Sequence, residues 1–283
     1  MTDPVPADEQ PPESLHQLIF SYLDKQRVVI TRGDVALRQG EEPIHRTRVA
    51  IRRYRSVLRV FAAEFATNDA AALDAELSWF ASLLGPVRDL QVLDRHLKGA
   101  LSGLPEGVDV AAAAAVIDAR LELDEAAARV TLKMALASAR YERLLATLDQ
   151  WKDNPPIVQA DRQATEVMRY VDAAERKVSR RLRRAPQAEN PDEAFHRARK
   201  AGKRARYAAE VSRPVFGAVA KRRIKQAKRL QNDLGEVQDS VVAQEFLQVL
   251  ASDPDTPGAA GFVLGLLWAH EQWRQEKALH HVG

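Results

Sequence analysis

The chain has 283 residues, of which 46% are hydrophobic and 29% charged, so it can bury the core of one large domain or two of ordinary size. It contains no cysteine, which excludes disulfide bonds and thiolate metal sites. The most apolar run, from Gly258 to Ala269, is too short to cross a bilayer, so we expect a soluble, cytoplasmic protein that does not enter a membrane.

The charge is distributed unevenly along the chain. The formal net charge is only +3, but residues 176–229 hold 19 Lys/Arg against 4 Asp/Glu. That segment therefore carries about +15 and the remainder about −12. Two large opposing blocks indicate a directed electrostatic field rather than an evenly solvated surface.

Helical periodicity runs through the first half, and no run of β-branched residues predicts a strand. The acidic, proline-rich residues 1–13 are predicted to be a disordered leader. The expected helices are one from Leu15, one after Gly40–Pro43 that runs to about Phe65, one that restarts at residues 67–69 and reaches Lys98 with a kink or turn at Gly85–Pro86, and one from Ala111 to about Trp151.

The strongest break in the middle of the chain is Asn154–Pro155–Pro156, and it predicts a boundary between two bundles at residues 14–153 and 154–283. In the second half, Asn190 is the expected N-cap of a helix, with Pro191 at its first position and Glu193 placed for a capping box. The other expected features are a helix from Ile157 to Arg184, an end of the Asn190 helix at Pro214 and Gly217, a long helix to Leu250, and a last helix from about Ala259 to His280.

Two phrases recur in the same order at nearly the same spacing. HRTRVAIRRYR begins at His45, and HRARKAGKRARY begins 151 residues later at His196. LLGPVRDLQVL from Leu83 aligns with DLGEVQDSVVA from Asp233, at an offset of 150 residues. The sequence therefore predicts a tandem duplication and an all-α architecture of two helical bundles.

On a helix, the basic residues of each phrase form a continuous stripe. The first stripe steps by three and four residues through His45, Arg48, Arg52, Arg55 and Arg59. The neighbouring register is apolar, so the helix buries one edge and presents cations beside it. The second stripe repeats the pattern with His196, Arg199, Lys203 and Arg206, next to small residues such as Gly202 that predict close helix packing.

Such rows of like charge need a compensating anion. Each like-charged pair at this spacing costs roughly a few tenths of a kcal/mol, and arginine offers paired donors that suit phosphate oxygens. The following helix adds further cations, namely Lys221, Arg222, Arg223, Lys225, Lys228 and Arg229. The pattern predicts a groove for an extended polyanion.

The phrases HxxRxxxRRxR with LGxxRD, and HxxRKxxKRxRY with LQxxLGxxQD, resemble the CHAD family, the conserved histidine α-helical domain, over essentially the whole chain beyond the leader. The resemblance implies two four-helix bundles related by pseudo-twofold symmetry, which bind inorganic polyphosphate on a central basic surface and in some members associate with polyphosphate granules. It implies a binding surface formed by His45, Arg48, Arg52, Arg53, Arg55, His196, Arg199, Lys203, Arg204 and Arg206, joined by Lys225, Lys228 and Arg229.

One departure from the repeat concerns Arg88, an expected anion contact, because Gln238 stands at the equivalent place in the second half. The chain also lacks the ExExK signature of the triphosphate-processing domain to which many family members are fused. It therefore resembles a stand-alone binding module.

Two other functions fit the same basic surface. A nucleic-acid binder would need aromatic side chains for base stacking, and the basic phrases contain only Tyr54 and Tyr207. A magnesium-dependent polyphosphate hydrolase would use Asp89 and Asp239, but a helix cap or an ion pair with arginine is the preferred interpretation of both.

The favoured prediction is a non-enzymatic polyphosphate-binding protein without cofactor or metal. Metal binding by His45 or His196 is disfavoured because each has an arginine three residues later. If these histidines become charged below neutral pH, binding should tighten on acidification.

Overall fold

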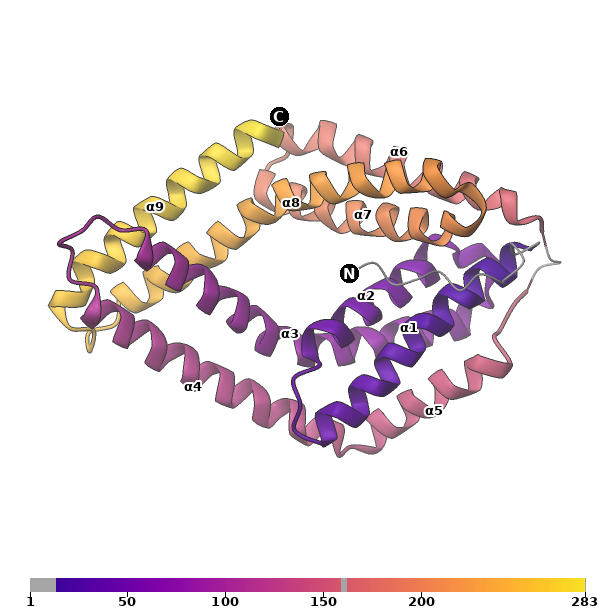
Figure 1. Ribbon diagram of the computed structural model, residues 1–283, viewed down its shortest axis with the longest axis horizontal. Coiled ribbons are helices and arrows are strands. Elements are labelled where there is room, and N and C mark those ends of the chain that lie inside the picture. Colours follow the sequence, from indigo (N-terminus) through magenta and orange to yellow (C-terminus); the bar gives the residue numbers. More distant parts are fainter. Residues whose placement is uncertain (1–13, 159–161, 283) are drawn as a thin grey trace.

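The computed structural model describes residues 14–158 and 162–282, and this part of the chain forms nine α-helices and three short 3-10 helices without a β-strand (Figure 1). The predicted all-α class is confirmed, whereas the predicted disordered leader lies outside the described residues. None of the described helices is long and apolar enough to span a membrane. The α-helices are α1 (Leu15–Arg38), α2 (Ile44–Val60), α3 (Thr67–Ser102), α4 (Ala111–Leu136), α5 (Ala139–Asp153), α6 (Val167–Arg184), α7 (Pro191–Val211), α8 (Arg213–Ala251) and α9 (Gly258–Val282), and the 3-10 helices are Ala62–Glu64, Ala164–Glu166 and Ala185–Gln187.

Side-chain caps fix the beginnings of several helices. Ser14 forms a capping box with Gln17 at the start of α1. Asn190 accepts a hydrogen bond from the backbone amide of Glu193 at 3.0 Å, with a proline in the first turn of α7, as the sequence predicted. These caps satisfy amide groups that have no partner within their own helix.

Some predicted boundaries were wrong. The expected single helix from Ala111 to Trp151 is divided, because Ser138 caps a new helix by accepting from the amide of Tyr141. α3 continues as one helix through Gly85 and Pro86, so no turn divides it there, whereas the kink expected at this proline stays a prediction. α2 ends at Val60 instead of about Phe65. α7 ends at Val211, and Gly217 lies inside α8 as a single non-helical residue with φ of 38°.

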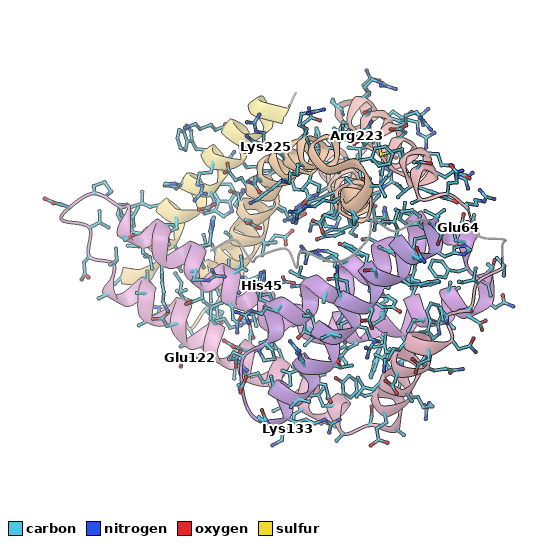
Figure 2. The ribbon with its side chains drawn as sticks, turned by 45° about the vertical axis from the view of Figure 1, so that its right-hand side comes forward. His45, Glu64, Glu122, Lys133, Arg223 and Lys225 are labelled. Atoms are coloured by element: carbon cyan, nitrogen blue, oxygen red, sulfur yellow. The ribbon has the colours of Figure 1, made fainter. Side chains whose placement is uncertain are left out.

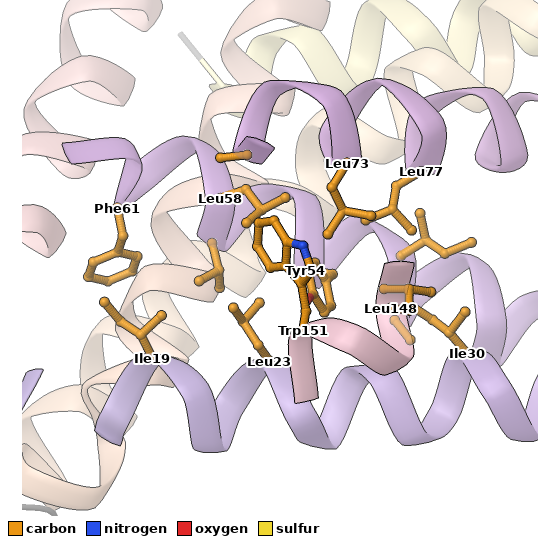
Figure 3. Close-up of a cluster of buried hydrophobic side chains, with 14 of the residues drawn as sticks. Ile19, Leu23, Ile30, Tyr54, Leu58, Phe61, Leu73, Leu77, Leu148 and Trp151 are labelled. Atoms are coloured by element: carbon orange, nitrogen blue, oxygen red, sulfur yellow. The ribbon is translucent and has the colours of Figure 1, made fainter. Parts of the chain in front are cut away.

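The main hydrophobic core lies between α1, α2, the first half of α3 and α5, and Figure 3 shows it in close-up. Ile19 and Leu23 of α1 face Tyr54 and Leu58 of α2, and Trp151 of α5 lies beside them. The beginning of α6 and the end of α7 complete this core. Burial of the α2 apolar edge fixes the rotation of that helix, so its basic stripe must lie at the edge of the core.

A second core combines segments from both halves of the chain. The end of α3 and the start of α4 pack with the end of α8 and with α9, through residues such as Leu97, Ile117, Leu247 and Leu264. A third, small cluster joins α6 and α7. The hydrophobic packing therefore does not divide at residue 153, and the two-bundle division by tandem repeat remains a prediction from the sequence.

The two longest helices connect these cores. α3 has 36 residues and α8 has 39, and each has one end in the second core. In Figure 1 they extend from the α4–α9 end of the molecule toward the groups formed by α1, α2 and α5 and by α6 and α7. α2, α3, α7 and α8 thereby surround the middle of the molecule.

Candidate anion-binding site

A hollow of 890 Å³ opens between α2, α3, α7 and α8, and we call it the central cavity. Among the side chains that the structure describes, nine lysines and arginines line it, against two carboxylates, Asp89 and Asp239. Figure 2 shows His45 close to the middle of the molecule, where these helices meet. The basic lining residues are Arg48, Arg52, Arg55, Arg59, Arg88, Arg199, Lys200, Lys203 and Arg204, and the histidines are His45, His96 and His196.

α2 presents its basic stripe to this cavity because the neighbouring face is held in the main core. Ile51 is fully buried, and Tyr54 and Leu58 are almost so. The cations of the stripe lie about a hundred degrees away on the helix. The structure thus brings His45, Arg48, Arg52, Arg55 and Arg59 to one wall.

α7 forms the opposite wall. Small buried residues, including Ala198 and Ala205, let it approach its neighbours closely. Arg52 of α2 donates a hydrogen bond to the hydroxyl of Tyr207 on α7 at 2.9 Å, so the two basic phrases touch directly. At Gly202, however, an added Cβ would lie 3.8 Å from Leu230, which is ordinary contact, so close packing does not explain why this residue is glycine.

Part of the positive charge is neutralised within the protein. Arg48 contacts Asp89 through two nitrogen–oxygen distances of 2.5 and 3.1 Å, which agrees with the ion pair preferred for this carboxylate. Arg55 and Arg59 share Asp74 at 2.9 and 2.6 Å. These bonds hold the guanidinium groups in place beside the cavity.

Burial and mutual repulsion make the charged form of other cations in the cavity less favourable. Burial, together with the charges of Arg199, Arg52 and Arg48, lowers the pKa of Lys203 to about 7. Burial is also the main reason why the pKa values of Arg199 and Arg204 are lowered. Asp239 offsets part of this effect at Arg199 and Lys203, and an anion entering the cavity would add further favourable interactions.

The surroundings of the two repeated histidines favour the neutral imidazole. Burial and the nearby guanidinium groups, first that of Arg88, lower the pKa of His45. Burial lowers the pKa of His196 as well, although its hydrogen bond with Gln238 opposes the change. His196 Nδ1 donates to Gln238 Oε1 at 2.6 Å, so Gln238 orients the histidine where the first half has Arg88.

Five predicted site residues lie outside the lining of the cavity. Arg53 and Arg206 both contact Glu210, at 3.2 and 3.0 Å, and both guanidinium groups lie over the ring of Tyr207. These two arginines support the wall instead of facing the cavity. The other three, Lys225, Lys228 and Arg229, are exposed on α8.

Several lining residues were not predicted. Lys200 belongs to the second basic phrase but falls outside its i, i+3, i+7 stripe. His96 lies two helical turns after Asp89 on α3, a spacing that could have identified it. Gln231 and Asn232 enter from α8. Among the described residues, histidine, aspartate and glutamate form no group of three that could hold a metal ion.

The fold and the cavity together define a class of all-helical proteins with a basic centre between two long helices. The family model described as the CHAD domain matches residues 21–248. The chain therefore belongs to the CHAD family, as its repeated phrases suggested.

Similar proteins and structures agree with this assignment. Two uncharacterized proteins of Mycobacterium tuberculosis, from strains CDC 1551 and H37Rv, are each 30% identical over 94% of this chain, which spans about half (51%) of their length. The crystal structure of the CHAD domain from the plant Ricinus communis is 27% identical, with a TM-score of 0.73 over 96% of this chain and 93% of that one. PptA from Streptomyces chartreusis has the same fold, with a TM-score of 0.77 at 22% identity over 94% of this chain and 97% of that one.

Proposed function

We propose that this protein binds inorganic polyphosphate in the central cavity, by electrostatic contacts from α2 and α7. The observation that carries the proposal is that nine Lys/Arg and only two carboxylates of the described part of the chain line one hollow of 890 Å³. Guanidinium and ammonium groups at this density favour a ligand with a charge on every repeating unit. Membership of the CHAD family supports the same ligand.

The absence of stacking partners favours a polyanion without bases. No phenylalanine, tyrosine or tryptophan is among the described residues that line the cavity. Proteins that bind single-stranded nucleic acids place aromatic rings between their cations to stack the bases. Polyphosphate needs only the cations.

The exposed lysines of α8 extend the proposed site. Lys221, Lys225 and Lys228 are spaced by four and three residues, and Asn232, which lines the cavity, follows four residues later. The four residues therefore lie on one face of α8, along about 16 Å of helix. We call the three lysines the α8 track, and it gives a long chain a path out of the cavity. Figure 2 shows Lys225 on this part of α8.

The proposed activity is binding, in the cytoplasm and at polyphosphate granules, and it requires no turnover of the ligand. A fluorescent fusion protein that stays diffuse in cells containing stained granules would contradict the granule location. Proteolytic cleavage of the fusion protein in the cells should be excluded before that result is interpreted.

The direct test compares affinities for long-chain polyphosphate and for single-stranded RNA of equal charge, over a range of salt concentrations. Polyphosphate should bind more tightly, and Arg52→Ala with Lys203→Ala should weaken binding while the helical circular dichroism signal is retained. Lys133→Ala with Lys152→Ala removes the same charge from exposed positions on α4 and α5 and serves as the control. Equal or tighter binding of RNA would identify a nucleic-acid protein instead.

A further inference from the structure

His96 is the one histidine of the cavity that neither basic phrase contains. Its Nε2 lies 2.9 Å from Oε2 of Glu271 on α9. The Glu271 side chain has no exposed surface, whereas the His96 side chain is 13% exposed. Since Nε2 faces the buried carboxylate, Nδ1 is the ring nitrogen left for the cavity.

The surroundings of Glu271 favour the ionised form of its buried carboxyl group. Burial would raise the pKa of Glu271, but the neighbouring side chains of His96 and Ser240 outweigh it and hold the pKa below its usual value. An ionised carboxylate beside the second core is costly, and an apolar pair could replace it without loss of stability. A buried acid that orients a histidine at the edge of a cavity is therefore a feature of functional sites.

His96 also lies close to cations of the cavity. His96, Arg199 and Lys203 are all neighbours of Asp239, whose pKa is raised mainly by burial. On α3, His96 follows Asp89 by seven residues, so both project toward the same side of the helix. A phosphoryl group beside His96 would thus have ammonium and guanidinium groups near its oxygens.

We propose that His96 is a nucleophile that accepts a phosphoryl group from polyphosphate bound in the central cavity, with Glu271 as its positioning residue. This inference rests on the proposed function, because bound polyphosphate is the donor, but it adds a covalent step. The arrangement follows the general design of activated nucleophiles, in which a third group fixes the tautomer of the histidine.

The step balances without a further reactant. The lone pair of Nδ1 attacks the terminal phosphorus, and the P–O bond to the next phosphate breaks. The electron pair leaves on the bridging oxygen, which becomes the new end of a chain shorter by one phosphate. The proton on Nε2 stays beside Glu271, whose negative charge balances the positive charge that forms on the ring.

The experiment incubates the full chain with inorganic polyphosphate and measures protein-bound phosphate that is labile in acid and stable in alkali, with the site located by mass spectrometry. Wild type should gain the label at His96. At polyphosphate concentrations that saturate its binding, His96→Asn should lose the label, and Glu271→Gln should be labelled at least about ten-fold more slowly. His270→Asn, on α9 outside the cavity lining, is the matched histidine control and should be labelled normally.

Two results separate this inference from the proposed function. Wild-type protein that binds polyphosphate but gains no label, or a label that persists in His96→Asn, overturns the role of His96 and leaves the binding function intact. Wild-type protein that fails to bind polyphosphate overturns the binding function and removes the donor with it.

Discussion

Removal of the α8 track should make the protein insensitive to the length of its ligand. The change is Lys221→Gln with Lys225→Gln and Lys228→Gln, three exposed side chains outside the cavity lining. Tripolyphosphate can occupy the cavity alone, so its affinity should be unchanged. Long chains should lose the contacts made along α8.

The size of the effect follows from the number of contacts. Each phosphate contact on a single strand contributes about −0.7 to the slope of log K against log[salt], so three lost contacts should flatten the slope by about 2. Raising the salt from about 50 to 200 mM weakens the binding of long chains to both proteins. The factor by which affinity falls should be about 20-fold smaller for the variant than for wild type.

The assay is a salt titration of binding, by calorimetry or fluorescence, with tripolyphosphate and with long chains in parallel. The control is Lys25→Gln with Lys133→Gln and Lys152→Gln, which removes the same charge from exposed positions on α1, α4 and α5. A slope for long chains that equals that of wild type would refute the α8 track. So would an equal loss of affinity for tripolyphosphate, because the lysines would then act on the cavity itself.

Three further changes test the cavity and the core. The pKa of Lys203 is about 7, and a bound polyanion should raise it. Affinity should therefore rise as pH is lowered from about 9 to 7, and Lys203→Met should remove this rise in binding titrations. Asp89→Asn releases Arg48 from its exposed ion pair and should tighten polyphosphate binding a few-fold in the same assay, consistent with about 0.2–1 kcal/mol for such pairs, whereas weaker binding would assign Asp89 to ligand contact. Leu77→Ala, at a fully buried position in the main core, should lower the free energy of unfolding in urea by about 2–5 kcal/mol, and a loss below 1 kcal/mol would contradict the packing described.

The sequence was sufficient to predict the helical class and most of the cavity walls. The i, i+3, i+7 spacing from His45 and from His196 placed each stripe on one helix face, and a helix face is a local property. Arg53 shows the limit of this reasoning. It is adjacent to Arg52 in sequence but points about a hundred degrees away, toward Glu210.

The remaining residues of the site depend on contacts between distant segments. His96 has no counterpart in the second half, where Phe246 stands at the equivalent offset, so the repeat gave no signal for it. Its partner Glu271 is 175 residues further along the chain, and only the packing of α9 against α8 and α4 brings the two side chains together. The division of Ala111–Trp151 was missed because Ala137 and Ser138 interrupt the helix without a proline or glycine.

The second core also constrains how the chain can fold during synthesis. Leu97 and Ile117 belong to helices made early, but Val263, Leu264 and Leu267 of α9 emerge from the ribosome much later. The apolar ends of α3 and α4 therefore lack their α9 partner until that helix has been translated. A nascent chain that stops before α9 can cover this surface only with the end of α8, which makes the interval a point at which chaperones or aggregation compete with folding.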